Sequence, residues 1–242
     1  MEYFLPYRVY KNLYEFLSYR KLSLVSGDLT KISKAAPDEN GLLKQGDFTT
    51  AIQYNGYIMM EASDTPEKSR RVINDMHPET GKKPTKTILV LLDQYSNHTD
   101  SAQDFNKLLN KLPNIGSSHL EHNMDVIIIP YENPSSNIVN KLLEHTSNGS
   151  EDSGYVRFML YSYAFFTSNK MKSSSIAPSR ILSKKEEKEV DGGILARRSA
   201  YSKIRVIDVV AVWLGAEIGD IIEEDIPSES SGIGRNYRLV RA

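Results

Sequence analysis

The chain has 242 residues with 30 basic and 31 acidic side chains, and a net charge of −1 argues against extensive coating of nucleic acid. It has no cysteine, which excludes a disulfide framework and a thiolate metal site or nucleophile and favours an intracellular protein. The start of the chain lacks the pattern of a signal peptide, and no run approaches about 20 apolar residues, so we expect neither secretion nor a membrane partner.

The first two-thirds of the chain predict an α/β domain. Val9, Leu13, Phe16 and Leu17 recur at helical spacing and predict an amphipathic helix. Short aliphatic runs then predict strands at 57–60, 87–92 and 125–129, and apolar periodicity predicts helices near 101–112 and at 136–144. The alternation of strand and helix indicates a core of two or three layers.

Residues 155–166 are rich in aromatic side chains and follow a polar insertion at 146–154. A stacking platform for nucleic acid is one interpretation, but burial in a core fits better because aromatic side chains bury large apolar areas. We predict a helix at 156–160 and a strand at 163–167. Lysines and serines then predict an exposed linker at 169–175, which would separate an N-terminal domain, 1–168, from a C-terminal domain, 176–242.

The C-terminal domain begins with a predicted helix. Ser183 and Glu186 form a capping-box pattern, and Asp191-Gly192-Gly193 predicts the end of that helix. Asp208 then precedes an apolar run to Leu214, so its carboxylate is expected to cap a second short helix.

Glycines and turn residues divide the rest of the domain. Gly215 is expected to end the second helix in the left-handed conformation, and Gly219 to mark a turn before a strand that starts at Ile221. Residues 226–236 predict a loop, and Tyr237 to Val240 a final strand.

This C-terminal segment resembles the C-terminal domain of the small subunit that the eukaryotic nuclear RNA polymerases share, a domain that the archaeal polymerase also contains. The family pattern matches without gaps from Ile204 to Leu239-Val240. The resemblance implies a role in polymerase assembly for ten residues of this pattern, namely Asp208, Trp213, Gly215, Gly219, Pro227, Ser228, Glu229, Gly232, Tyr237 and Arg238.

The chain also departs from the family pattern. Val209 replaces a proline, and Ile226 and Ile233 replace arginines beside the Pro-Ser-Glu motif. Glu217 and Ile218 stand where basic residues are usual, and with acidic residues 223–225 they predict a more acidic face and an altered charge complementarity with partners. These departures indicate a divergent member, such as one from a large DNA virus.

The N-terminal domain resembles the jaw domain of the same family over residues 7–25, which implies an inactive restriction-endonuclease-like topology. Thr99-Asp100-Ser101-Ala102 is similar to the family's helix start beside downstream DNA, so the resemblance implies that Thr99, Ser101 and Ala102 lie near DNA. Asp100 replaces a proline there, and its carboxylate would repel a phosphate.

A metal-dependent DNA-processing nuclease is an alternative function. Asp47 and Glu61 are ordered like the acids of such an enzyme, but Ala62-Ser63 follows where the catalytic lysine is required. We therefore predict no catalytic residue in this chain.

Two further patterns favour ordinary surface roles. His119 and His122 could share a helical face, but a third ligand is missing, so we predict neither a metal nor a cofactor. Residues 68–86 form the most basic stretch of the chain, which a solvated loop explains better than a phosphate contact because no aromatic residues are interleaved.

The resemblance implies a non-catalytic subunit of a multisubunit DNA-dependent RNA polymerase. Such a subunit would bind the largest polymerase subunit near a second small shared subunit, and its jaw would border downstream duplex DNA non-specifically. It would act in the nucleus if the source is cellular, and in the host cytoplasm and the virion if the source is viral. A transient polymerase-binding adaptor is the remaining alternative.

Overall fold

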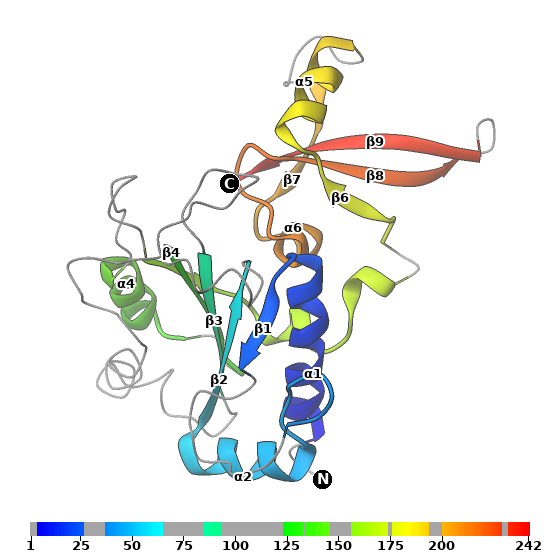
Figure 1. Ribbon diagram of the computed structural model, residues 1–242. Coiled ribbons are helices and arrows are strands. Elements are labelled where there is room, and N and C mark those ends of the chain that lie inside the picture. The colour runs from blue at the N-terminus through cyan, green and yellow to red at the C-terminus, as the bar shows by residue number, and fades with distance from the viewer. Residues whose placement is uncertain are drawn as a thin grey trace, which may run out of the picture. The chain divides into compact units, whose positions relative to one another are not determined.

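The structure is a computed structural model that describes residues 4–26, 37–64, 85–92, 123–132, 134–145, 156–173, 176–193, 200–228 and 232–242. The protein is a mixed α/β protein with two sheets (Figure 1). Contacts within the chain define two units, unit 1 at Met1–Thr167 and unit 2 at Ser168–Ala242. The described part of the chain contains no helix long and apolar enough to span a membrane.

Unit 1 is built on a five-stranded mixed sheet in the order β1-β2-β3-β4-β5. The strands are β1 (Ser23–Ser26), β2 (Tyr57–Ser63), β3 (Thr85–Leu92), β4 (Asn123–Ile129) and β5 (Val156–Leu160). β1, β2 and β3 pair antiparallel, whereas β3, β4 and β5 pair parallel. The predicted strands at 57–60, 87–92 and 125–129 are confirmed, since unbroken aliphatic runs are typical of strands buried on both faces. The helix predicted near 101–112 lies outside the described residues.

Helices lie on both sides of this sheet (Figure 1). The predicted first helix is confirmed as α1 (Phe4–Tyr19), and α2 (Gln45–Asn55) contacts β2. α4 (Ser136–His145) confirms the helix predicted at 136–144, and its Ile138 belongs to a buried apolar cluster with side chains from β2 to β5. The periodic apolar residues of α1 are buried, as their spacing predicts.

The aromatic segment folds differently from the prediction. Residues 156–160 form strand β5 rather than a helix, because Val156, Phe158 and Leu160 alternate along one face and join the cluster with Ile138. The next four residues form the 3₁₀ helix η3 (Tyr163–Phe166) rather than a strand, since the Ser162 hydroxyl caps the Ala164 N–H at 3.4 Å. Phe166 is fully buried, which fits a core role for the segment.

Unit 2 contains a four-stranded sheet in the order β6-β8-β9-β7. Its elements are η4 (Lys170–Lys172), β6 (Ser179–Ile181), α5 (Lys184–Gly193), β7 (Ser202–Arg205), α6 (Val209–Leu214), β8 (Ile221–Ser228) and β9 (Gly232–Arg241). α5 and α6 lie on opposite sides of this sheet (Figure 1). Within the segment predicted as a linker, η4 contacts α6.

The loop predicted at 226–236 is wrong for most of its length. β8 continues to Ser228, and β9 starts at Gly232, so only 229–231 lie between them and outside the described residues. The Asp225 N–H points toward β6 and donates to the Pro178 carbonyl, just before β6 starts. Two residues later, the nitrogen of Pro227 points to the same side, where β6 no longer pairs with β8. Proline is tolerated there because no ladder hydrogen bond is lost.

Candidate functional site

The residues that match the polymerase pattern concentrate in unit 2, and several of them build α6. Asp208 caps this helix, since its Oδ1 accepts the Val210 N–H at 2.9 Å. Trp213 is fully buried, and Gly215 ends the helix at φ 73°. The cap and the helix end predicted from the sequence are confirmed, and these three residues determine the fold of the unit rather than its surface.

Gly219 joins the turn after α6 to the last strand. It adopts φ 99°, a conformation that residues with a Cβ rarely take, and its N–H donates to the Val240 carbonyl at 3.0 Å. Among the described residues, no heavy atom outside residues 218–220 lies within 4 Å of the place that a Cβ would take at this position. The backbone conformation, not a lack of space, therefore accounts for glycine here.

Tyr237 and Arg238 each bond to a buried acid on β8. The Tyr237 hydroxyl donates to Glu223 Oε1 at 3.3 Å, and Arg238 Nη1 lies 3.0 Å from Glu224 Oε1. Consecutive residues of a strand point to opposite faces, so the two pairs lie on opposite faces of the sheet. Both residues stabilise the β8–β9 pairing from within the sheet.

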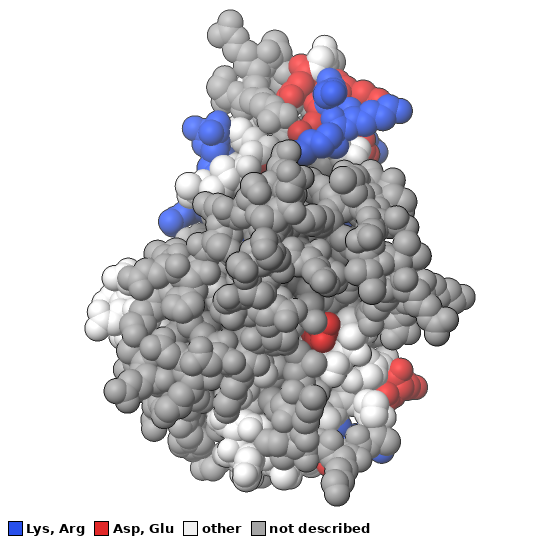
Figure 2. Space-filling model, turned by 60° about the vertical axis from the view of Figure 1, so that its left-hand side comes forward, with Lys and Arg blue, Asp and Glu red and all other residues white. Residues whose placement is uncertain are grey.

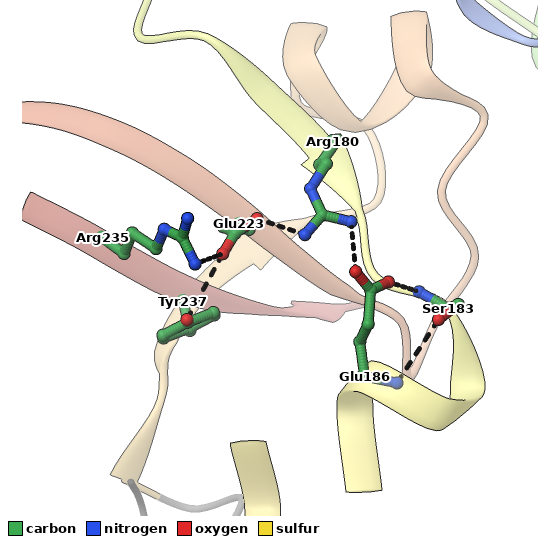
Figure 3. Close-up of polar contacts among 6 residues, drawn as sticks. All are labelled: Arg180, Ser183, Glu186, Glu223, Arg235 and Tyr237. Carbon is green, nitrogen blue, oxygen red and sulfur yellow. Dashed lines mark hydrogen bonds and ion pairs between the residues drawn. The ribbon is translucent and has the colours of Figure 1, made fainter. Parts of the chain in front are cut away.

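Glu223 is the centre of a polar network that extends to α5 (Figure 3). Arg180 of β6 bonds Glu223 Oε2 at 2.7 Å and Glu186 Oε1 at 2.8 Å, and Arg235 approaches Glu223 Oε1 at 3.5 Å. Arg180 thereby connects β6, β8 and the start of α5. Arg180 could not be identified from the sequence, because three-residue β6 carries no periodic signal of its own.

Glu186 closes the capping box that the sequence predicts. Its Oε2 accepts the Ser183 N–H at 2.8 Å, while its own N–H donates to the Ser183 hydroxyl at 3.3 Å (Figure 3). The Ser183 backbone N–H, followed by the Ser183 hydroxyl and Arg180, lowers the pKa of Glu186 from an ordinary 4.5 to about 2. The carboxylate therefore stays ionised to strongly acidic pH.

The predicted acidic face does not form. Glu223 and Glu224 are buried on opposite faces of β8, and each is paired with arginine. The prediction added neighbouring charges along the sequence, whereas strand geometry separates them. On part of the unit 2 surface, Lys and Arg side chains lie beside Asp and Glu side chains (Figure 2). Other Lys and Arg side chains of this unit lie away from acidic ones.

Pro227, Ser228 and Gly232 of the pattern lie at the end of the β8–β9 hairpin, which we call the ribbon end and define as residues 225–228 and 232–235. Pro227 pairs with Ile233, and Ser228 with Gly232, whose φ is 73°. Ile226 is 41% exposed and Ile233 is 65% exposed. Glu229 lies outside the described residues. The ribbon end thus presents exposed apolar side chains on a two-stranded extension of the sheet.

Most of the candidate residues of unit 1 lie outside the described residues. Thr99, Ser101 and Ala102 lie outside the described residues, as do His119, His122 and most of the basic stretch at 68–86. Asp47 lies in the first turn of α2, and Glu61 is half-buried on β2. Within the described ranges, no three His, Cys, Asp or Glu side chains gather in a group that could hold a metal ion.

The resemblance to the polymerase subunit depends on the residues of the pattern alone. No protein-family model matches the chain, and no curated protein matches it.

Proposed function

We propose that this chain is a non-catalytic subunit of a multisubunit DNA-dependent RNA polymerase. Unit 2 anchors it to the largest subunit, near a second small shared subunit. Unit 1 is the jaw domain, with an inactive restriction-endonuclease-like topology, and it borders the downstream DNA duplex. The contribution of the chain to transcription is mechanical, because it holds the jaw in place beside the DNA.

One observation carries this proposal: the residues of the polymerase pattern divide into structural positions and exposed positions within one unit. Asp208, Trp213 and Gly215 build α6, and Tyr237 secures the hairpin. The Pro-Ser part of the Pro-Ser-Glu motif lies at the ribbon end. Such a division supports an assembly module, since a docking surface needs both a rigid support and exposed contact residues.

The ribbon end is the proposed contact with the largest subunit. Exposed apolar side chains that become buried on association contribute about 25 cal/mol for each Å² removed from water. Isoleucines at 226 and 233, in place of the basic residues usual in the family, favour an apolar rather than a charged contact. Binding through this surface should therefore resist high salt, because salt screens charge pairs but not apolar burial.

Affinity purification of the tagged chain from its native source tests the proposal. After a high-salt wash, we expect stoichiometric large polymerase subunits by mass spectrometry and RNA synthesis from a promoter-independent template. Recovery of the chain alone would overturn the proposal, and recovery of large subunits only at low salt would favour the transient adaptor.

A matched pair of substitutions tests the ribbon end itself. Ile233→Asp should release the large subunits, because a carboxylate would be buried in the contact. Ile218→Asp is the control, since Ile218 is 62% exposed, close to the 65% of Ile233, but lies in the turn after α6. If the Ile233→Asp and Ile218→Asp variants recover equal amounts of the large polymerase subunits, the contact does not lie at the ribbon end.

A further inference from the structure

Three basic side chains gather at the edge of the second sheet where β7 and β9 end. Lys203 and Arg205 alternate along edge strand β7, so they share one face. Arg241 is the parallel partner of Arg205, which places its side chain on the same face. All three side chains are exposed. We call Lys203, Arg205 and Arg241 the basic edge.

The basic edge is electrostatically unfavourable when it has no bound partner. Paired strands lie about 4.8 Å apart, and like charges side by side across them are destabilising. The other described arginines of unit 2, Arg180, Arg235 and Arg238, each pair with a glutamate. Among the described residues, by contrast, no acid pairs with the three basic-edge side chains. This concentration of positive charge therefore favours an anionic ligand.

The backbone of β7 supplies further hydrogen-bond donors. The Val206 N–H bonds the Arg241 carbonyl at 2.7 Å, so alternation directs the N–H groups of Lys203 and Arg205 away from β9. The carbonyls of these two residues already have partners: Arg205 accepts the Asp208 N–H at 2.9 Å, and Lys203 accepts Arg238 Nη2 at 3.5 Å. The outward side of β7 therefore offers donors and positive charge.

We propose that the basic edge binds the phosphate backbone of a nucleic acid. Phosphate oxygens accept hydrogen bonds and carry negative charge, and guanidinium groups bind them in a bidentate manner. An acidic peptide added as a further strand fits less well, because a β-ladder requires carbonyl acceptors along β7 and these are already engaged. The contact reads no base sequence, since it uses backbone phosphates alone.

This site is separate from the jaw contact, which the proposed function places in unit 1. It can be tested on the purified 242-residue chain, without polymerase. The chain could bind phosphate through the basic edge without belonging to a polymerase, or belong to one without this contact. Failure of one proposal is therefore distinguishable from failure of the other.

Fluorescence anisotropy with a labelled duplex of about 20 base pairs, titrated at several salt concentrations, tests the site. The variant Arg205→Glu/Arg241→Glu should bind at least tenfold more weakly than the unmodified chain at low salt. The slope of log affinity against log salt should fall by about one for each phosphate that the variant no longer binds. The neutral variant Arg205→Gln/Arg241→Gln should show an intermediate loss, and circular dichroism checks the folding of both.

The control variant is Lys185→Glu/Lys188→Glu, which changes the net charge equally through two exposed lysines of α5 in the same unit. It should retain nearly full binding if the basic edge, rather than net charge, is responsible. Equal losses in the control and the basic-edge variants would overturn the proposal, as would unchanged binding in all of them. Stronger competition by polyglutamate than by unlabelled DNA would identify an acidic polypeptide as the partner instead.

Discussion

Lys21 follows α1 in a backbone conformation that suits glycine. Its φ is 57°, and the Leu22 N–H bonds the Leu17 carbonyl at 2.9 Å, as in a left-handed helix cap. A side chain in this conformation costs about 1 kcal/mol. Lys21→Gly should therefore raise the free energy of unfolding by up to about 1 kcal/mol in urea titrations. Lys11→Gly, inside α1, should lower it by about 1 kcal/mol instead.

Glu186 gives unit 2 a defined response to acid. Because its pKa is lowered to about 2 from 4.5 in the folded protein, its contribution is fully present above pH 4.5 and is lost as the pH falls toward 2. Glu186→Gln should therefore unfold at a lower temperature than the unmodified chain at pH 7, and the difference should shrink at pH 3. Glu189→Gln, on the same helix, should follow the unmodified chain at both values of pH.

Capping residues were predictable from the sequence because their bonds are local. Asp208 reaches an N–H two residues away, and Ser183 and Glu186 are three residues apart. Arg180 was not predictable, because its partner Glu223 comes from a strand more than 40 residues later. Sequence spacing states which groups can cap a helix, but it carries no information about such distant pairs.

At the scale of elements, the buried pair between β4 and β5 should stabilise the parallel half of the first sheet. Arg157 Nε lies 2.9 Å from Asp125 Oδ1, and Arg157 Nη2 lies 2.9 Å from Asp125 Oδ2. Only 10% of the Asp125 side chain is exposed. Arg157→Met would leave a buried carboxylate unpaired. We expect a loss of about 2 kcal/mol in the free energy of unfolding, below the range for fully buried pairs because Arg157 is partly exposed.

The double variant Asp125→Leu/Arg157→Met separates this effect from general damage to the sheet. Removing both charges should recover much of the loss, because apolar residues often replace a buried ion pair without cost. If Arg157→Met alone leaves the urea midpoint unchanged, the pair contributes nothing to stability.

The predicted elements failed where local patterns compete. The long aliphatic runs of β3 and β4 had no rival interpretation, whereas β5 is five residues long and rich in aromatic side chains. Its strand conformation depends on pairing with β4, which a local pattern does not reveal. The β8–β9 ribbon was hidden for a similar reason, since its Pro, Gly and Ser residues favour a loop until the partner strand is present.

At the scale of the whole molecule, sequence periodicity predicted an α/β protein but not the order of its strands. Both sheets are mixed, and β7 pairs with β9 across the intervening α6 and β8. Parallel neighbours are selected by packing between segments far apart in the chain. The basic edge depends on this order, because Arg205 and Arg241 become neighbours only through that pairing.

The chain should not cleave DNA. Glu61 lies on β2, and alternation places Ser63, two residues later, on the same face of the strand. A metal-dependent nuclease of this arrangement needs a lysine there, since the ammonium group helps to stabilise charge at the scissile phosphate. A serine hydroxyl cannot supply that charge. Purified protein incubated with supercoiled plasmid and Mg²⁺ or Mn²⁺ should therefore leave it intact. Cleavage that Asp47→Ala abolishes would identify an active nuclease and overturn the proposed role of unit 1 as an inactive jaw. Cleavage that persists in this variant would indicate a contaminating enzyme.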